Sequence, residues 1–104
     1  MNTTDTRKAQ DLAIRRQQIL TFAVAAMTTL GLSDHWITTI CFDPFESTIS
    51  FSHGRGGAEL AIGLDAAYPD RFEVGTQSWR HSSMIGNMTW DSAVARFWEL
   101  SSSL

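Results

Sequence analysis

The hydrophobic period of the sequence changes from that of a helix to that of strands between residues 30 and 35, and this change restricts the fold class more than any other feature. Up to residue 30 the apolar residues recur with a helical period, whereas after residue 34 they alternate with polar residues as in strands. A long amphipathic helix and half-buried strands can bury their apolar faces together when the helix lies on one face of an antiparallel sheet. We therefore expect an α+β fold.

The N-terminal helix is expected to begin at the N-cap candidates Thr-Asp-Thr at 4–6 and to end at Gly31, a typical C′ residue. Its apolar residues form one broad face: Ala9, Leu12, Ala13, Ile19, Leu20, Ala23, Val24, Ala26, Met27 and Leu30. Arg16 falls within this face, where we expect it to extend along the edge of the contact. Phe22 falls on the polar side, so the sequence does not decide whether its ring packs in the core or makes a surface contact.

Four strands are expected, over His35–Phe42, Phe45–His53, Ala58–Asp65 and Arg71–Trp79. The first strand should place Trp36, Ile40 and Phe42 on one face, and the second should place Phe45, Ile49 and Phe51 toward the core. Residues 80–88 have no clear period and are predicted to form a connecting loop.

Thr89 is expected to cap a C-terminal helix with an apolar stripe of Trp90, Ala93, Val94, Phe97 and Leu100. The predicted order is α-β-β-β-β-α within one domain over residues 1–104. Both helices should pack on one face of a four-stranded antiparallel sheet and leave the other face polar and open.

The charge and cysteine content exclude several classes of protein. Eight Lys and Arg residues and a net charge of −3 weigh against nucleic-acid binding through phosphate contacts. A single cysteine fits a reducing compartment, so a cytoplasmic location is expected. Arg15 and Arg16 precede an apolar stretch as in a secretory signal, but threonines interrupt the stretch and it is shorter than the roughly 20 residues of a membrane span. We therefore expect no membrane association.

No motif for catalysis or metal binding is present. The sequence contains no CxxC, HxH or HExxH metal-ligand pair and no GxSxG nucleophile motif. Cys41 is expected to be an inert, buried thiol within a strand. Glu59 and Glu73 are expected to share the open sheet face as ordinary surface acids. We expect no catalytic residue, metal or cofactor.

The residues left for function are those that the core pattern does not claim. Arg55 sits at the tip of a Gly-Arg-Gly-Gly hairpin, and the segment 79–90 combines aromatic residues and methionines. The candidate partner-binding residues are Phe22, Arg55, Trp79, Arg80, Met84, Ile85 and Met88. They predict a non-catalytic protein-binding module that acts as a small inhibitor, adaptor or chaperone-like protein.

Two alternatives stay open. His53, Arg55 and His81 could surround one end of the sheet and bind a small ligand or anion, or support hydrolysis. An edge strand or the segment 79–90 could instead pair two copies into a homodimer.

The expected order of a helix followed by three strands, together with the acidic charge, is similar to that of type III secretion chaperones. The likeness covers the first two thirds of the chain and rests on topology. It implies a small acidic dimer that binds a segment of another protein. Small acidic proteins of phages and mobile elements that inhibit host defence complexes, including anti-CRISPR proteins, share this size class. Both comparisons imply a protein as the binding partner.

Overall fold

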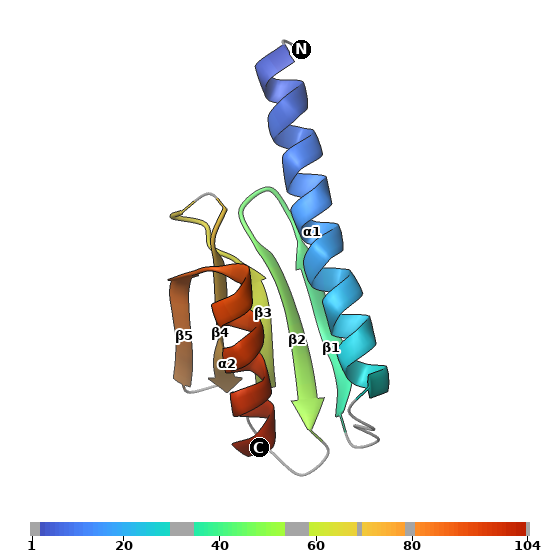
Figure 1. The fold of residues 1–104 in the computed structure, drawn as a ribbon, viewed down its shortest axis with the longest axis vertical. Coiled ribbons are helices and arrows are strands. Elements are labelled where there is room, and N and C mark those ends of the chain that lie inside the picture. Colours follow the sequence, from blue (N-terminus) through green and yellow to red (C-terminus); the bar gives the residue numbers. More distant parts are fainter. Residues whose placement is uncertain (1–2, 30–34, 54–58, 69, 79–80, 104) are drawn as a thin grey trace.

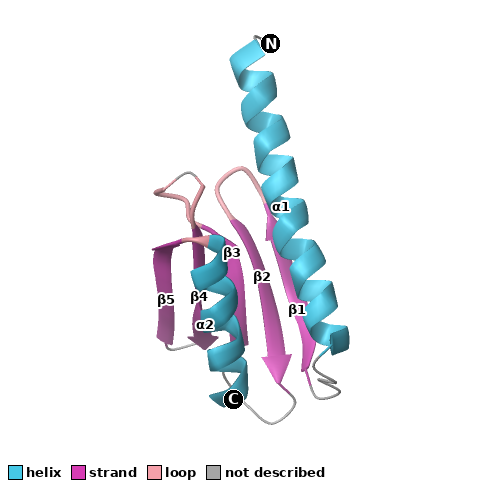
Figure 2. Ribbon diagram, viewed as in Figure 1, coloured by secondary structure: helices cyan, strands magenta, loops and turns pink. Residues whose placement is uncertain are grey.

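The computed structural model describes residues 3–29, 35–53, 59–68, 70–78 and 81–103. Two helices lie on one face of a five-stranded antiparallel sheet with strand order β1-β2-β3-β4-β5 (Figures 1 and 2). The elements are α1 (Thr3–Thr29), β1 (His35–Phe42), β2 (Ser47–His53), β3 (Glu59–Leu64), β4 (Phe72–Ser78), β5 (His81–Met88) and α2 (Trp90–Ser103). The expected α+β class, antiparallel sheet and position of both helices are confirmed.

The predicted loop at residues 80–88 is wrong, because residues 81–88 form β5 beside β4. A bulge hides the strand pattern: Phe72 pairs with Met88, but Val74 pairs with Ile85, so β5 has one residue more than β4 over this interval. Asn87 at the bulge has a φ of 55°. The sheet therefore has five strands, and the prediction of four was one too few.

Asp65 fixes this bulge from the loop after β3. Its Oδ2 accepts a hydrogen bond of 2.6 Å from the Asn87 N–H, and its Oδ1 accepts one of 2.8 Å from the Ala67 N–H. A Cβ added to Gly86 would lie 2.3 Å from the same Asp65 Oδ2. Glycine therefore allows the carboxylate to reach the bulge.

The expected inward position of Phe45 is also wrong. Asp43 Oδ1 accepts hydrogen bonds of 2.7 Å from the backbone N–H groups of both Phe45 and Glu46. This side-chain turn holds the chain out of the sheet until Ser47, so β2 begins two residues later than predicted. Phe45 consequently lies in the turn, and 89% of its surface is exposed.

The predicted faces of β1 are tested only in its second half, because the side chains of residues 35–38, Trp36 and Ile37 among them, lie outside those that the structure describes. A register shift between Ile37 and Thr39 interrupts the backbone pairing of β1 with β2. Beyond the shift, Ile40 lies opposite Ile49 as expected.

The core lies between the sheet and the two helices. Its fully buried residues of largest volume are Phe51, Phe97, Ile19, Ile49, Leu60, Ile62 and Val74. Phe22 joins α1 to α2, because its ring lies 5.0 Å from that of Phe97, 5.4 Å from Trp90 and 5.5 Å from Trp98, with edge-to-face geometry. Thr89 caps α2 as predicted, through a hydrogen bond of 3.3 Å from the Ser92 N–H to its Oγ1.

The N-terminal part of α1 extends beyond the sheet (Figure 1). The helix has 27 residues, and residues 6–11 are all exposed. In the parts of the chain that the structure describes, neither helix is both long and apolar enough to cross a bilayer.

Candidate functional site

A pocket lies where α1 meets two loops at one end of the sheet. It has a volume of about 260 Å³ and is lined from α1 by Leu12, Arg15 and Arg16, and from the turn after β1 by Pro44 and Phe45. Leu64, Asp65 and Ala66 close it from the end of β3. We call this space the turn pocket.

Arg16 fastens α1 to the turn that borders the pocket. Its Nε donates a hydrogen bond of 2.8 Å to Ser47 Oγ, and its Nη2 donates to the carbonyl oxygens of Asp43 and Glu46. The guanidinium also lies 5.2 Å from the centroid of the Phe42 ring. The expected contact of Arg16 along the edge of the core is confirmed. Its Nε and Nη2 groups hold the turn through hydrogen bonds.

Arg15 performs the same task for the second loop. Its Nη2 donates a hydrogen bond of 2.9 Å to the Arg71 carbonyl oxygen, and its guanidinium lies 5.5 Å from the centroid of the Phe72 ring. The two consecutive arginines therefore tie one turn of α1 to two different loops, which gives the turn pocket a fixed frame.

Phe45 is the most exposed large apolar residue among those that the structure describes, at 89%. Complete burial of a phenylalanine side chain contributes about 2 kcal/mol. A partner that covered Phe45 could therefore gain up to this amount of binding free energy. Tyr68, on the loop after β3, is 51% exposed. The sequence analysis missed Phe45, although the Asp-Pro pair before it is a turn signal that could have moved it out of the strand.

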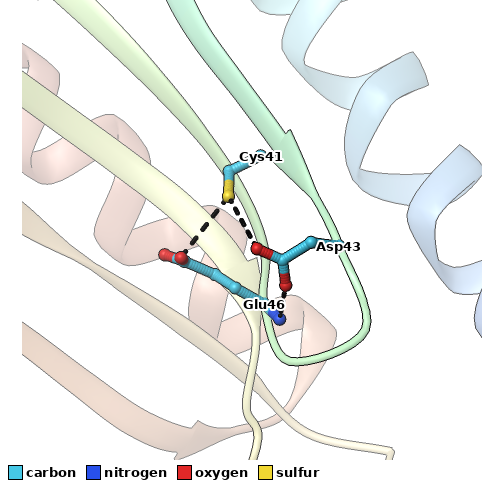
Figure 3. Close-up of side chains that lie close together, drawn as sticks. All are labelled: Cys41, Asp43 and Glu46. Atoms are coloured by element: carbon cyan, nitrogen blue, oxygen red, sulfur yellow. Dashed lines mark hydrogen bonds between the residues drawn. The ribbon is translucent and has the colours of Figure 1, made fainter.

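On the open face of the sheet, the same turn brings together Cys41, Asp43 and Glu46 (Figure 3). The Cys41 Sγ lies 3.4 Å from Glu46 Oε2 and 3.6 Å from Asp43 Oδ2. Hydrogen bonding of the thiol to Glu46, desolvation, the second hydrogen bond to Asp43 and the two negative charges raise the pKa of Cys41 to about 11. The thiol is therefore protonated at neutral pH.

This group is also the one cluster of His, Cys, Asp and Glu ligands in the described part of the chain whose atoms could surround a metal ion. Its geometry is already accounted for by the turn, because Asp43 Oδ1 accepts two backbone N–H groups and Glu46 Oε1 accepts a hydrogen bond of 3.2 Å from Thr48 Oγ1. A cation would have to displace the thiol proton. The arrangement is that of a hydrogen-bonded turn, in which the thiol and the two carboxylates bind one another.

Glu59 and Glu73 share the open face, as the sequence indicated, but lie at opposite ends of it. Glu73 pairs with Gly63 and Glu59 pairs with Gln77, so the two are offset by four residues along β3, or about 13 Å. A glycosidase pair needs a separation of at most about 9.5 Å. Burial, followed by the charges of Asp65 and Glu46, raises the pKa of Glu73.

The structure separates the residues that the sequence proposed for partner binding. Met84 lies opposite Gly75 and is half-buried, and Ile85 lies opposite Val74 and is 47% exposed, so the two occupy opposite faces of β5. Met88 and Phe22 pack against the core, which removes the reason for placing them at an interface. Arg55, Trp79 and Arg80 lie outside the described residues.

The described backbone does not bring together His53, Arg55 and His81, the residues of the ligand-binding alternative. His53 ends β2 and His81 begins β5, at the same end of the sheet but three strands apart, or about 14 Å. Arg55 lies outside the described residues. The backbone register therefore gives this alternative no support.

Comparison with known proteins gives no information on function, so the proposal below is based on the geometry of the structure. No protein-family model matches the chain, and no match was found among the curated proteins or the solved structures.

Proposed function

We propose that the chain is a non-catalytic protein-binding module that acts as a small inhibitor, adaptor or chaperone-like protein by occupying a partner's surface. The observation that carries the proposal is the position of Phe45, which is 89% exposed beside the turn pocket. Aromatic residues that a partner can bury are typical centres of protein interfaces. The turn pocket would receive an apolar side chain of the partner while Phe45 packs against it.

The frame around Phe45 favours binding because little of it needs to be ordered on contact. Asp43 holds the backbone of the turn through two hydrogen bonds of 2.7 Å, and Arg16 holds the turn to α1. A preorganised loop loses less conformational entropy when a partner binds. The lining of the turn pocket is also mixed in chemistry, since it combines apolar residues such as Phe45 and Leu64 with the charged residues Glu46 and Asp65, and protein interfaces likewise combine apolar and polar groups.

The proposal of a non-catalytic role rests on the state of Cys41. A nucleophilic cysteine needs a lowered pKa and a neighbouring base that takes its proton, whereas the two carboxylates beside Cys41 raise its pKa to about 11.

Met84 and Ile85 on β5 offer a second surface for the same function. β5 is an edge strand, and its sequence His-Ser-Ser-Met-Ile-Gly-Asn-Met has no charged residue and no proline. Such an edge can accept an extended segment of a partner as an added strand. The two surfaces are distinguishable, because β5 lies at the opposite edge of the sheet from β1 and its turn.

The experiment is affinity capture of the tagged chain from lysate of its native host or natural prey, with bound proteins identified by mass spectrometry. Phe45→Ser should abolish capture of a stoichiometric partner and leave the fold intact, since the side chain is exposed. Ile14→Ser is the matched control, because Ile14 is 68% exposed, is not part of the lining of the turn pocket, and lies about 160° around the helix from both Leu12 and Arg16 and about 100° from Arg15.

Loss of the partner with Ile85→Lys and not with Phe45→Ser would move the binding site to β5. Unchanged capture by both variants would refute binding through either surface.

A further inference from the structure

β1 and the second half of α1 contain no residue with a formal charge, and the nearest charged groups, those of Arg16, Asp43 and Glu46, lie at the C-terminal end of β1. Residues 17–29 of α1 and all of β1 contain no Asp, Glu, Lys or Arg, whereas the first half of the same helix contains six such residues: Asp5, Arg7, Lys8, Asp11, Arg15 and Arg16. Depletion of charge is typical of the centre of a protein interface.

The contacts of Phe22 with α2 show which side of α1 faces α2, and the opposite side of α1 is therefore the one toward the sheet edge at β1. Phe22 faces α2, and Leu20 and Val24 each lie two residues from it, about 160° around the helix. They therefore face away from α2, toward the edge of the sheet. Val24 is 53% exposed, and with Leu20 it borders an open groove of about 440 Å³ along the helix.

β1 continues this surface as an open sheet edge. In the described part of the chain it pairs with β2 alone, and it has neither a charge nor a proline to block a further strand. Ile40, on the helix-covered face of β1, is 49% exposed although it lies opposite the fully buried Ile49. Something that covers β1 would complete the burial of Ile40 and Val24 together.

The opposite edge of the sheet, at β5, does not combine an uncharged strand with an uncharged helix. β5 is equally uncharged, but α2, which packs on β3, β4 and β5, carries Asp91, Arg96 and Glu99. An uncharged strand and an uncharged helix flank therefore coincide at the β1 edge.

We propose that a second copy of this chain covers the edge, with β1 paired antiparallel to its own copy across a two-fold axis. This pairing would join the two sheets into one of ten strands and bring the two α1 flanks together on the same face. A two-fold interface requires only that the surface complement itself. An uncharged surface meets this condition without like-charge repulsion, and it lacks the charges that would select a different partner.

The available area is sufficient for a weak dimer. β1 is about 27 Å long, and the sheet and helix layers together are about 20 Å deep, which gives roughly 500 Å² per copy. The total of about 1,000 Å² is at the lower limit of specific interfaces. The dimer should therefore dissociate on dilution.

Sedimentation of the full chain over about a hundredfold range of concentration tests the proposal. We expect the wild type to pass from monomer to dimer as concentration rises. Val24→Lys and Ile40→Lys should raise the dissociation constant at least about tenfold. The matched control is Ile85→Lys, because Ile85 has nearly the same exposure as Ile40, 47% against 49%, on the opposite edge strand.

Circular dichroism checks the fold of each variant, and Val24→Lys remains decisive if Ile40→Lys unfolds, since Val24 is an exposed helical residue. A wild type that stays monomeric at the highest concentration would overturn the proposal. A dimer that persists in Val24→Lys, or that is lost in Ile85→Lys alone, would overturn it as well. Phe45→Ser should dimerise like the wild type, which separates this proposal from that of partner binding at the turn pocket.

Discussion

Replacement of Gly75 by alanine tests the pairing of β4 with β5, the element that the sequence did not predict. A Cβ at this position would lie 2.0 Å from the Ser83 carbonyl oxygen and 2.7 Å from the Met84 Cα. Both are backbone atoms of β5, so a rotamer change cannot relieve the contact. To restore an ordinary separation of about 3.4 Å, β5 would have to move by more than about 1 Å, which breaks ladder hydrogen bonds.

The sign of the change in unfolding free energy shows whether β5 lies against Gly75 or whether position 75 is unstrained. Alanine in place of glycine at an unstrained position usually stabilises a protein by about 0.4–1 kcal/mol, through the entropy of the unfolded chain. Here overpacking costs about 1–3 kcal/mol, and one lost ladder hydrogen bond costs about 1 kcal/mol more. We expect Gly75→Ala to lower the free energy of unfolding by about 2–3 kcal/mol.

The assay is urea unfolding followed by tryptophan fluorescence, with Gln77→Ala as the control in the same strand. Gln77 is half-buried on the same face and lies opposite Ser82, so its truncation should change stability by less than 1 kcal/mol, the usual range away from special sites. A Gly75→Ala variant as stable as the wild type, or more stable, would refute the close approach of β5 and with it the assigned register.

Three further predictions concern ionisable groups. Because the pKa of Glu73 is raised in the folded state by burial and by the charges of Asp65 and Glu46, Glu73→Gln should be more stable than the wild type at pH 7, and urea unfolding at several pH values should show the difference vanish below the ordinary value of 4.5. Burial alone would raise the pKa of Asp65, but backbone hydrogen bonds from Asn87, Ala67 and Tyr68 lower it below its ordinary value of 3.8. Asp65→Ala should therefore lower the free energy of unfolding at pH 7, by about 1 kcal/mol once solvent screening of this largely exposed carboxylate is included. This loss should become smaller as the pH falls below 3.8 and through the lowered pKa, and a loss that stays the same in acid would contradict the reasoning. The raised pKa of Cys41, about 11 against 9.0, should leave it about a hundredfold less thiolate than an ordinary cysteine at pH 8; Glu46→Gln should accelerate alkylation of Cys41 severalfold, and equal rates would exclude Glu46 as the main cause.

The parts of the fold that the sequence predicts well are those with an uninterrupted period. The stripe of Ala93 and Phe97 in α2, and the alternation of Leu60, Ile62 and Leu64 in β3, lie in the core as expected. In these segments each residue's position follows from its neighbours three, four or two residues away.

The errors occur where a side chain interrupts the backbone pattern. Asp43 binds the amides of Phe45 and Glu46 and so delays β2, and Asp65 reaches 22 residues along the chain to hold the bulge at Asn87. A local pattern contains no sign of the second contact, because it depends on two loops that meet only in the folded chain.

The candidate site was missed for a related reason. A phenylalanine at position 45 fits the alternation of the second strand, and this alternation predicts a core position for it. The helical period alone does not decide whether Phe22 is buried, because it does not show that α2 lies beside α1, with Trp90 and Phe97 in reach of the Phe22 ring. Exposure and burial of aromatic residues at the borders between elements depend on tertiary packing.

The most direct test of the proposed function is hydrogen exchange of the chain with and without its captured partner. The proposal predicts that the partner slows exchange of the amides at 45–47 and 65–68, around the turn pocket, while those of β5 exchange as in the free chain. Protection confined to residues 81–88 would place the interface on β5 and contradict the assignment of the binding site to Phe45.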